Sequence, residues 1–351
     1  MIKKEIMEYI KKNKIKKIYS ERALETATIE ILTSCNFKCI HCYNQDIEQR
    51  LLKFNDFKSI IDQLLKQGCK YITITGGEPL LHPDFEKIYH YCINKGLKIS
   101  LFTNGYFIDK YLELFKEYAP KKIEISLYGA NNKTYEDICK IKNGFNKVIS
   151  NIKLLTSNKI NLHLKTVIME KNCKDFVKME KLCSKMGLPF KFDLIILKSK
   201  NFSNNQSSNI INSKFTKFMN YIKDKKLNEW KTYPSRYKDK NKIDFLYKCY
   251  AGRKSIYIGS NCGARICNFA EFSEQNLKKI SLSDAWKSFD KYMLLPDDKS
   301  SECYKCKYRS CCGNCPVSTY MNNKTDGKNI LPVEQNCREA KFIYEAIKND
   351  N

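Results

Sequence analysis

The distribution of cysteine constrains this chain of 351 residues more than any other feature. Of seventeen cysteines, three lie within residues 35–42, nine lie between residues 249 and 337, and five are scattered between these groups. A secreted protein would pair its cysteines in disulfides, but here their number is odd and their placement is uneven. We therefore expect metal-bound thiolates in a reducing, cytoplasmic environment.

Composition excludes several classes of protein. Hydrophobic residues make up 42% of the chain, enough for a sizeable core. The formal net charge is +25, but the lysines are spread along the sequence, so we expect no nucleic-acid partner; an acidic electron donor would suit this surface. The lysine-rich first twenty residues lack the apolar core of a signal peptide. No run of 18 apolar residues exists, so we expect no membrane partner.

Apolar and β-branched runs alternate with helical patterns in the first two hundred residues. Six strands alternating with helices indicate βα units on a parallel sheet. A closed eight-stranded barrel needs more units, so the prediction is a partial (βα)6 barrel, followed by a small cysteine-rich domain. The predicted strands are Thr28–Thr33, Tyr71–Thr75, Leu97–Thr103, Lys122–Leu127, Asn161–Ile168 and Phe190–Ile195, and the predicted helices cover residues 54–67, 84–95, 109–118, 144–157 and 174–186.

The change in composition along the chain predicts its domains. After residue 197 the sequence becomes rich in Asn, Ser and Lys, with one helix expected near 211–226. From residue 246, cysteines and turns replace the βα pattern, and such a small region is normally held together by metal. The expected divisions are a basic helix and linker at 1–27, a core at 28–197, a connection at 198–245, a cluster-binding domain at 246–340 and a tail at 341–351.

The first three clustered cysteines directly follow the first predicted strand, in the order Cys35-Asn-Phe-Lys-Cys39-Ile-His-Cys42. Three thiolates can bind three irons of a cubane and leave the fourth iron without a protein ligand. Such an open position is where another molecule can coordinate. Zinc would require a fourth ligand, and His41 is badly placed to supply it beside Cys42. The spacing therefore favours an iron–sulfur cluster.

This CxxxCxxC motif, together with later segments in the same order, resembles the radical S-adenosylmethionine (SAM) superfamily. Gly76-Gly77-Glu78-Pro79 follows the second strand, Thr103-Asn104-Gly105 ends the third, and Ser126-Leu127-Tyr128-Gly129 ends the fourth. The resemblance implies a SAM-cleaving [4Fe–4S] cluster on the three cysteines and a 5′-deoxyadenosyl radical that abstracts hydrogen. It also implies that Glu78 accepts a hydrogen bond from the SAM ammonium. The implied SAM-binding residues are His41, Tyr43, Gly76, Gly77, Glu78, Pro79, Thr103, Asn104, Ser126 and Lys165.

The C-terminal cysteines resemble the SPASM extension, which implies two auxiliary [4Fe–4S] clusters. The spacing departs from the family pattern at two places, so Cys311 remains an alternative to Cys312, and without Cys262 one cluster would keep an open iron. A zinc-ribbon reading accounts for fewer of the cysteines. The implied ligands are Cys249, Cys262, Cys267 and Cys315 for one cluster, and Cys303, Cys306, Cys312 and Cys337 for the other. Cysteines 69, 92, 139, 173 and 183 are expected to be buried packing residues.

The segment Ile125–Tyr135 resembles SPASM enzymes that modify ribosomally made peptides. This resemblance implies hydrogen abstraction from a peptide substrate, then formation of a thioether or carbon–carbon crosslink. The alternatives are formylglycine formation as in sulfatase maturation, disfavoured by Asn268 after Cys267, and oxidation of a small alcohol or carbohydrate. The expected electron donor is a flavodoxin or ferredoxin. Because only 27 residues precede the first strand, peptide recognition is expected to need either a separate peptide-recognition protein or the N-terminal helix and the barrel themselves.

Overall fold

The structure is a computed structural model that describes residues 22–44, 47–196, 198, 215–233 and 245–350. The N-terminal helix expected within residues 1–27 lies outside the described residues, apart from residues 22–27. The chain forms two compact units. The larger unit comprises residues 20–210 and 250–288, and the smaller comprises residues 1–19, 211–249 and 289–351. Residues 250–288 therefore group with the βα core, although the sequence placed a boundary at 246.

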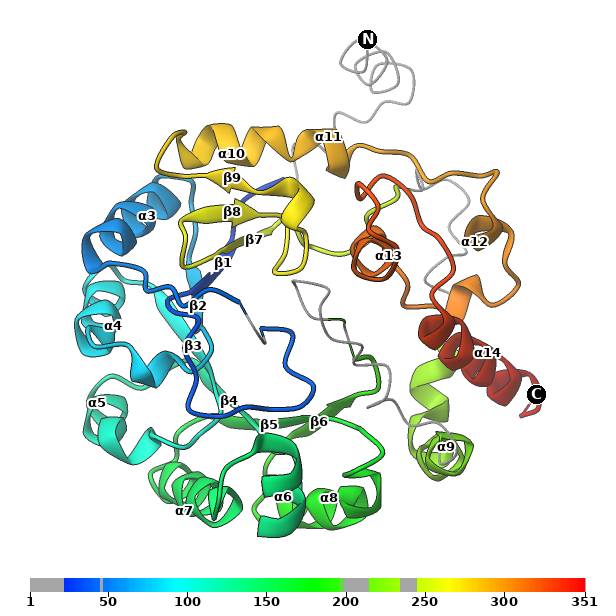
Figure 1. The fold of residues 1–351 in the computed structure, drawn as a ribbon, viewed down its shortest axis with the longest axis horizontal. Helices are drawn as coiled ribbons and strands as arrows, with labels where there is room; N and C mark the ends of the chain where they lie inside the picture. Colours follow the sequence, from blue (N-terminus) through cyan, green and yellow to red (C-terminus); the bar gives the residue numbers. More distant parts are fainter. Residues whose placement is uncertain (1–21, 45–46, 197, 199–214, 234–244, 351) are drawn as a thin grey trace. The chain divides into compact units, whose positions relative to one another are not determined.

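A nine-stranded sheet is the centre of the larger unit, in the order β6-β5-β4-β3-β2-β1-β7-β8-β9. The strands from β6 to β7 are parallel, and β8 and β9 are antiparallel. Figure 1 shows the parallel part curving into an open arc, which confirms the predicted partial barrel. The strands are β1 (Thr26–Glu30), β2 (Tyr71–Thr75), β3 (Lys98–Thr103), β4 (Lys122–Ser126), β5 (Leu162–Val167), β6 (Phe190–Asp193), β7 (Ser255–Ile258), β8 (Gly263–Arg265) and β9 (Gln275–Asn276).

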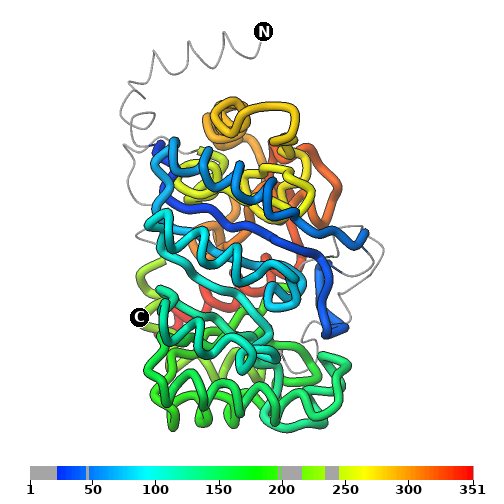
Figure 2. Tube along the Cα trace, turned by 90° about the vertical axis from the view of Figure 1, so that its left-hand side faces the viewer, coloured from blue at the N-terminus to red at the C-terminus, as the bar shows by residue number. Residues whose placement is uncertain are grey.

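Helices cover the convex face of this arc, and Figure 2 shows the first of them side by side on that face. Each strand alternates between the two faces. In β2, Ile72 and Ile74 are buried, whereas Thr73 and Thr75 are half-buried. The apolar side chains of the strands thus form the core with the helices, and polar ones remain for the concave face. The helices of this unit are α3 (Phe54–Lys66), α4 (Phe85–Asn94), α5 (Leu112–Glu117), α6 (Asn132–Cys139), α7 (Gly144–Ser157), α8 (Phe176–Lys185) and α10 (Leu282–Ser288).

Two features of this unit differ from expectation. Helix α6 was not predicted; it begins after Asn131, whose side chain accepts a hydrogen bond from the Thr134 N–H at 2.9 Å. Strand β7 extends the parallel sheet by pairing with β1, with Thr28 opposite Tyr257. The sequence did not predict this pairing, because a pairing between segments so far apart leaves no local pattern.

The smaller unit is mainly helical. Helices α9 and α14 pack together, with the rings of Trp230 and Phe342 6.2 Å apart. Helix α14 continues to Lys348, so the residues after 340 form a helix where a tail was expected. The helices of this unit are α9 (Phe215–Lys231), α11 (Asp290–Met293), α12 (Glu302–Lys305), α13 (Pro316–Asn323) and α14 (Glu334–Lys348). Among the described residues, no helix has both the length and the apolar character that a membrane span requires.

Candidate active site

A cavity of about 1050 Å³ lies in the larger unit, on the concave face of the parallel sheet. Polar or aromatic side chains of successive strands line it, among them Thr28, Thr75, Phe102 and Ser126. All three cysteines of the first motif also line this cavity. The fold thus brings the cysteine loop to the carboxyl ends of the strands, where parallel α/β folds bind their ligands.

The cysteine loop is docked on the end of α6. The Lys38 N–H donates to the Cys139 carbonyl at 3.0 Å, and the Ile40 N–H donates to the Ile138 carbonyl at 2.9 Å. The last carbonyls of a helix have no partner within the helix, so a neighbouring loop can supply the donors. Lys140 ends α6 in the left-handed conformation, with φ of 57°. Helix α6, which the sequence did not predict, therefore positions the cysteine motif, which the sequence did predict.

The three thiols of the loop are close enough to influence one another. Burial raises the pKa of Cys35 to about 12, and the negative charges of Glu78, Cys39 and Cys42 act in the same direction. The Phe37 N–H opposes this by donating to the Cys35 sulfur at 3.3 Å. Without metal the Cys35 thiol keeps its proton, so iron binding must displace that proton. Three thiols at one rim, with a cavity beside them, fit a cubane with an accessible fourth iron.

The glycines of Gly76-Gly77-Glu78-Pro79 permit close packing against the entrance of the cysteine loop. The Gly77 N–H donates to the Leu32 carbonyl at 2.9 Å, and the Glu78 N–H donates to the Ser34 carbonyl at 2.8 Å. A Cβ at Gly77 would lie 2.3 Å from the Ser34 carbonyl oxygen. Both glycines line the cavity, whereas Glu78 and Pro79 do not.

Glu78 is fully buried and holds the end of β3. Its carboxylate accepts hydrogen bonds from the Thr103 hydroxyl at 2.7 Å, the Asn104 N–H at 2.7 Å and the Leu80 N–H at 3.1 Å. Burial raises the pKa of Glu78 to about 7, although these hydrogen bonds favour the charged form. A carboxylate has about four acceptor positions, so these three bonds leave one for the expected contact with the SAM ammonium.

The remaining polar residues predicted on the strands reach the cavity. Thr103, Asn104, Ser126 and Lys165 all line it. The Asn104 amide donates to the Asn36 side chain at 2.8 Å and lies 3.8 Å from the Cys35 sulfur, so it also orients the cysteine loop. The Lys165 ammonium is 2.8 Å from the Glu124 carboxylate. The same carboxylate also pairs with the Lys122 ammonium at 3.0 Å, so one negative charge faces two positive ones.

His41 and Tyr43 flank the cavity beside the last cysteine of the motif. Burial lowers the pKa of His41 to about 4, so its ring is neutral near pH 7. The ring lies 4.5 Å from that of Tyr128, and Nδ1 has no hydrogen-bond partner in the described structure. The ring of Tyr43 lies 4.7 Å from that of Phe269. Both side chains present flat surfaces that suit an aromatic ligand such as adenine.

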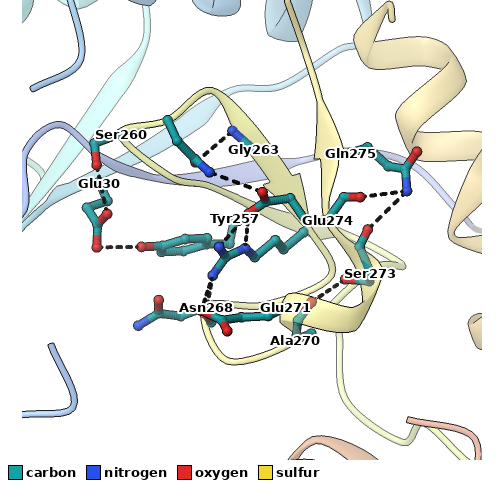
Figure 3. A network of polar contacts seen from close by, with 12 residues as sticks. Glu30, Tyr257, Ser260, Gly263, Asn268, Ala270, Glu271, Ser273, Glu274 and Gln275 are labelled. Carbon is teal, nitrogen blue, oxygen red and sulfur yellow. Dashed lines mark hydrogen bonds and ion pairs between the residues drawn. The ribbon is translucent and has the colours of Figure 1, made fainter. Parts of the chain in front are cut away.

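A buried polar network joins β1 to β7 next to the cavity (Figure 3). The Glu30 carboxylate accepts hydrogen bonds from the Tyr257 hydroxyl at 2.8 Å and the Ser260 hydroxyl at 3.1 Å. The Asn44 amide donates to the same carboxylate at 3.3 Å. Asn44 follows the cysteine motif, so this network also fixes the far end of the cysteine loop. Sequence patterns gave no signal for it, because its members are distant in the chain.

Residues 266–269 form a second loop that reaches the cavity. Arg265 holds this loop, because its guanidinium donates to the Glu274 carboxylate at 2.6 Å and to the Asn268 carbonyl at 3.3 Å. Cys267 lines the cavity, whereas Cys262 does not. Cys262 is buried in the turn before β8, and its neighbouring charges are Asp56 and Lys278. The structure therefore does not bring Cys262 to the cavity that Cys267 lines.

The other predicted ligands lie in the smaller unit. The charges of Cys303, Cys306 and Cys337 all act on the thiol of Cys312, whose pKa is raised to about 11, chiefly by burial. By contrast, the pKa of Cys311 is raised by burial, and its thiol hydrogen-bonds to the hydroxyl of Ser310. The charge of Cys249 likewise raises the pKa of Cys315. Among the described residues, no three His, Cys, Asp or Glu side chains are already spaced to hold a single metal ion.

Comparison with known proteins agrees with this geometry. Residues 29–183, which contain the cysteine loop, the glycine segment and strands β2–β5, match the model of the radical SAM superfamily. Residues 29–183 are therefore a radical SAM domain. Such a domain implies a [4Fe–4S] cluster and SAM, and the trio of thiols at the cavity rim suits them.

Two relatives and one solved structure extend the likeness beyond the matched domain. The antilisterial bacteriocin subtilosin biosynthesis protein AlbA of Bacillus subtilis (strain 168) is 28% identical over 324 residues, covering 88% of this chain and 71% of its own. The AdoMet-dependent heme synthase of Methanosarcina barkeri is 20% identical, covering 83% of this chain and 90% of its own. Streptococcus suis SuiB bound to precursor peptide SuiA has a TM-score of 0.69 at 17% identity, covering 92% of this chain and 79% of the other. At that identity the structural likeness establishes the fold.

Proposed function

We propose that this chain is a radical SAM maturase that abstracts hydrogen from a ribosomally made peptide and installs a thioether or carbon–carbon crosslink. The observation that carries the proposal is the similarity to a bacteriocin biosynthesis protein over 88% of the chain, well beyond the radical SAM domain. A solved structure with the same fold holds a precursor peptide. The cavity of this chain, at about 1050 Å³, lies at the upper end of the range of about 300–1,000 Å³ for single-ligand pockets.

The residues at the cavity suggest a division of roles. A [4Fe–4S] cluster held there would supply the electron for cleavage of SAM, from which the hydrogen-abstracting radical would derive. Cys35, Cys39 and Cys42 would hold the cluster, and the backbone of Gly76 and Gly77 would approach the methionine part of SAM. The neutral ring of His41 would lie against adenine without adding charge. The protein thus orients the cofactor and shields it from water.

Two auxiliary [4Fe–4S] clusters are part of the proposal. For one of them, Cys303, Cys306, Cys312 and Cys337 are supported as ligands by their mutual electrostatic influence, which favours Cys312 over Cys311. For the other, the predicted ligands remain Cys249, Cys262, Cys267 and Cys315, and the interaction between Cys249 and Cys315 supports that pair. Cys262 rests on spacing alone, because the structure does not bring it to the cavity that Cys267 lines.

The proposed partners follow from the chemistry. Reduction of the cluster requires an electron donor, and an acidic flavodoxin or ferredoxin would complement a chain of formal charge +25. A separate protein that recognises the peptide is a further proposed partner. Oxygen-sensitive clusters and free thiols suit the cytoplasm.

The test is an anaerobic assay of the reconstituted chain with SAM, dithionite and precursor peptides encoded beside its gene. We expect 5′-deoxyadenosine, and a peptide that has lost two hydrogen atoms for each crosslink, measured by mass spectrometry. The triple variant Cys35→Ala/Cys39→Ala/Cys42→Ala should lose both products. Cys183→Ala, which changes a buried cysteine of α8, should retain both. Production of 5′-deoxyadenosine with every peptide unchanged would contradict the peptide-substrate proposal and leave the radical SAM chemistry intact.

A further inference from the structure

Three exposed lysines, which we call the lysine surface, gather where the cysteine loop meets the end of α6. Lys38 lies within the loop, and Lys140 and Lys142 follow the last residue of the helix. The Lys38 N–H donates at 3.0 Å to the carbonyl of Cys139, the residue just before Lys140. The fold therefore brings these lysines together, although Lys38 is distant from the other two in the sequence.

The charges of the lysine surface are not neutralised by ion pairs. Within the part of the chain that the structure describes, none of its three ammonium groups has a carboxylate at ion-pair distance. Other charged residues close to the loop and helix are used in pairs. The Arg50 guanidinium lies 2.8 Å from the Glu48 carboxylate, and the Lys147 ammonium lies 2.9 Å from the Asp109 carboxylate.

The acidic residues of α6 reduce the positive charge of this region but do not cancel it. Glu136 and Asp137 occupy exposed positions of the helix, and Lys133 occupies a third. With the lysine surface included, four lysines stand against two acids, which leaves two positive charges in excess. The cysteine loop is thus bordered by a region with net positive charge.

The lysine surface lies where an electron has to enter the site. Cys35 is exposed at the start of the cysteine loop, and Lys38 stands between Cys35 and Cys39 in the chain. A cluster held by this loop would therefore be close to these lysines. Electron transfer between proteins slows steeply with distance, so a donor has to bind next to the cluster that it reduces. Excess positive charge attracts an acidic partner and raises its association rate.

We propose that Lys38, Lys140 and Lys142 form the docking surface for an acidic electron-donor protein of the flavodoxin or ferredoxin class. The bound donor passes one electron to the SAM-cleaving cluster, so the donor is oxidised, the cluster is reduced and no atom is transferred. The lysines act by holding the donor and take no part in SAM cleavage itself. The inference rests on the electron donor of the proposed function and does not depend on the peptide substrate.

The test compares a protein donor with a small reductant on the full-length reconstituted chain. Lys140→Glu/Lys142→Glu reverses two charges and leaves the cysteine loop unchanged. Formation of 5′-deoxyadenosine from SAM is measured anaerobically, without peptide, using a reduced acidic flavodoxin or reduced methyl viologen, a small cation that needs no docking surface. The flavodoxin-driven rate should fall about tenfold at low salt, and the rate with methyl viologen should stay unchanged. High salt should slow the wild type and narrow the difference between the proteins.

Lys159→Glu/Lys185→Glu is the matched control, because it changes the net charge by the same amount. Both lysines are exposed, and Lys159 shares the left-handed backbone of Lys140, with φ of 55° and 57°. They lie after α7 and at the end of α8, just before β5 and β6 begin. The cysteine loop follows the carboxyl end of β1, so the control lysines lie at the opposite end of the parallel strands. The control should keep the wild-type rate with both reductants.

Several results would overturn the proposal. One is a flavodoxin-driven rate that the variant retains, or that the control loses to the same extent. Another is an equal loss with both reductants at full iron content. A third is failure of both an acidic flavodoxin and an acidic ferredoxin to support SAM cleavage by the wild type. A variant that keeps the flavodoxin-driven rate but no longer binds a precursor peptide would assign the surface to the peptide instead. If the glutamate variant binds less iron, Lys140→Gln/Lys142→Gln replaces it, with a smaller expected loss.

Discussion

Gly77 allows the loop after β2 to contact the entrance of the cysteine loop through backbone atoms alone. An added Cβ would lie 2.3 Å from the carbonyl oxygens of both Thr33 and Ser34. These atoms belong to the main chain and cannot rotate away. We therefore expect Gly77→Ala to destabilise the protein by about 2 kcal/mol or more, as overpacking does, and to reduce the iron bound at the first motif. Thermal unfolding and iron content measure the two effects.

Gly313→Ala is the matched control for this substitution. A Cβ at Gly313 meets no atom within 4 Å. Its melting temperature should therefore stay close to that of the wild type, because substitutions in open space usually change stability by about 0.5 kcal/mol or less. Equal melting temperatures for the two variants would show that the Gly77 contact relaxes without cost.

Glu78 should give the stability a specific pH dependence. Its pKa is raised from 4.5 to about 7 by burial, so the folded state holds this proton more tightly than the unfolded state does. The resulting stabilisation is fully present below pH 4.5 and is lost as the pH rises towards 7. Glu78→Gln cannot titrate. The wild type should therefore lose about 3 kcal/mol of stability relative to Glu78→Gln across this interval.

Denaturant unfolding of both proteins at several pH values tests this expectation. Glu78→Gln replaces an acceptor with an amide and should be less stable overall, so the slope of the difference is the informative quantity. A difference that is constant with pH would mean that the three hydrogen bonds to the carboxylate outweigh its burial.

At the scale of elements, local patterns predicted the βα units well. The bounds of β2 and α7 match the predicted ranges, because in each segment the hydrophobic residues repeat with a clear period and the pattern ends at a clear position. The pairing of β7 with β1 was not predictable, since register between distant segments depends on tertiary packing. Helix α6 was missed because its cap, Asn131, follows a loop-like segment and its helix is short.

Strand β7 should depend on the hydrogen bond between Tyr257 and Glu30. Tyr257→Phe removes a buried donor at 2.8 Å from the carboxylate and leaves the ring in place. We expect a loss of about 1–2 kcal/mol in the free energy of unfolding, the usual result of deleting one buried hydrogen bond. The control is Tyr250→Phe, because the Tyr250 side chain is 71% exposed and its change should cost little. Equal stabilities of Tyr257→Phe and the wild type in denaturant would show that the hydrogen bonds from Ser260 and Asn44 are sufficient for the Glu30 carboxylate.

At the scale of the whole molecule, the candidate site was predictable where ligands follow one another closely in sequence. The trio Cys35, Cys39 and Cys42 and the glycine segment are local motifs with one chemical explanation, and the structure places the trio and both glycines at one cavity. The contributions of Tyr257 and Asn268 could not be inferred, because they reach the cavity through β7 and the loop after β8. Cys262 stays a prediction from spacing, and the structure does not bring it to this cavity, since spacing alone does not reveal which side of a turn a thiol occupies.

The adjacent pair Cys311 and Cys312 offers a test of the second metal region that sequence spacing left open. The charges of Cys303, Cys306 and Cys337 raise the pKa of Cys312, whereas burial raises the pKa of Cys311. Cys312→Ala should therefore lower the iron and sulfide content by up to one cubane, about four irons. Cys311→Ala should retain the wild-type content, because it removes only a packing thiol. Anaerobic reconstitution with iron and sulfide analysis compares the two, and a greater loss in the Cys311 variant would reverse the assignment.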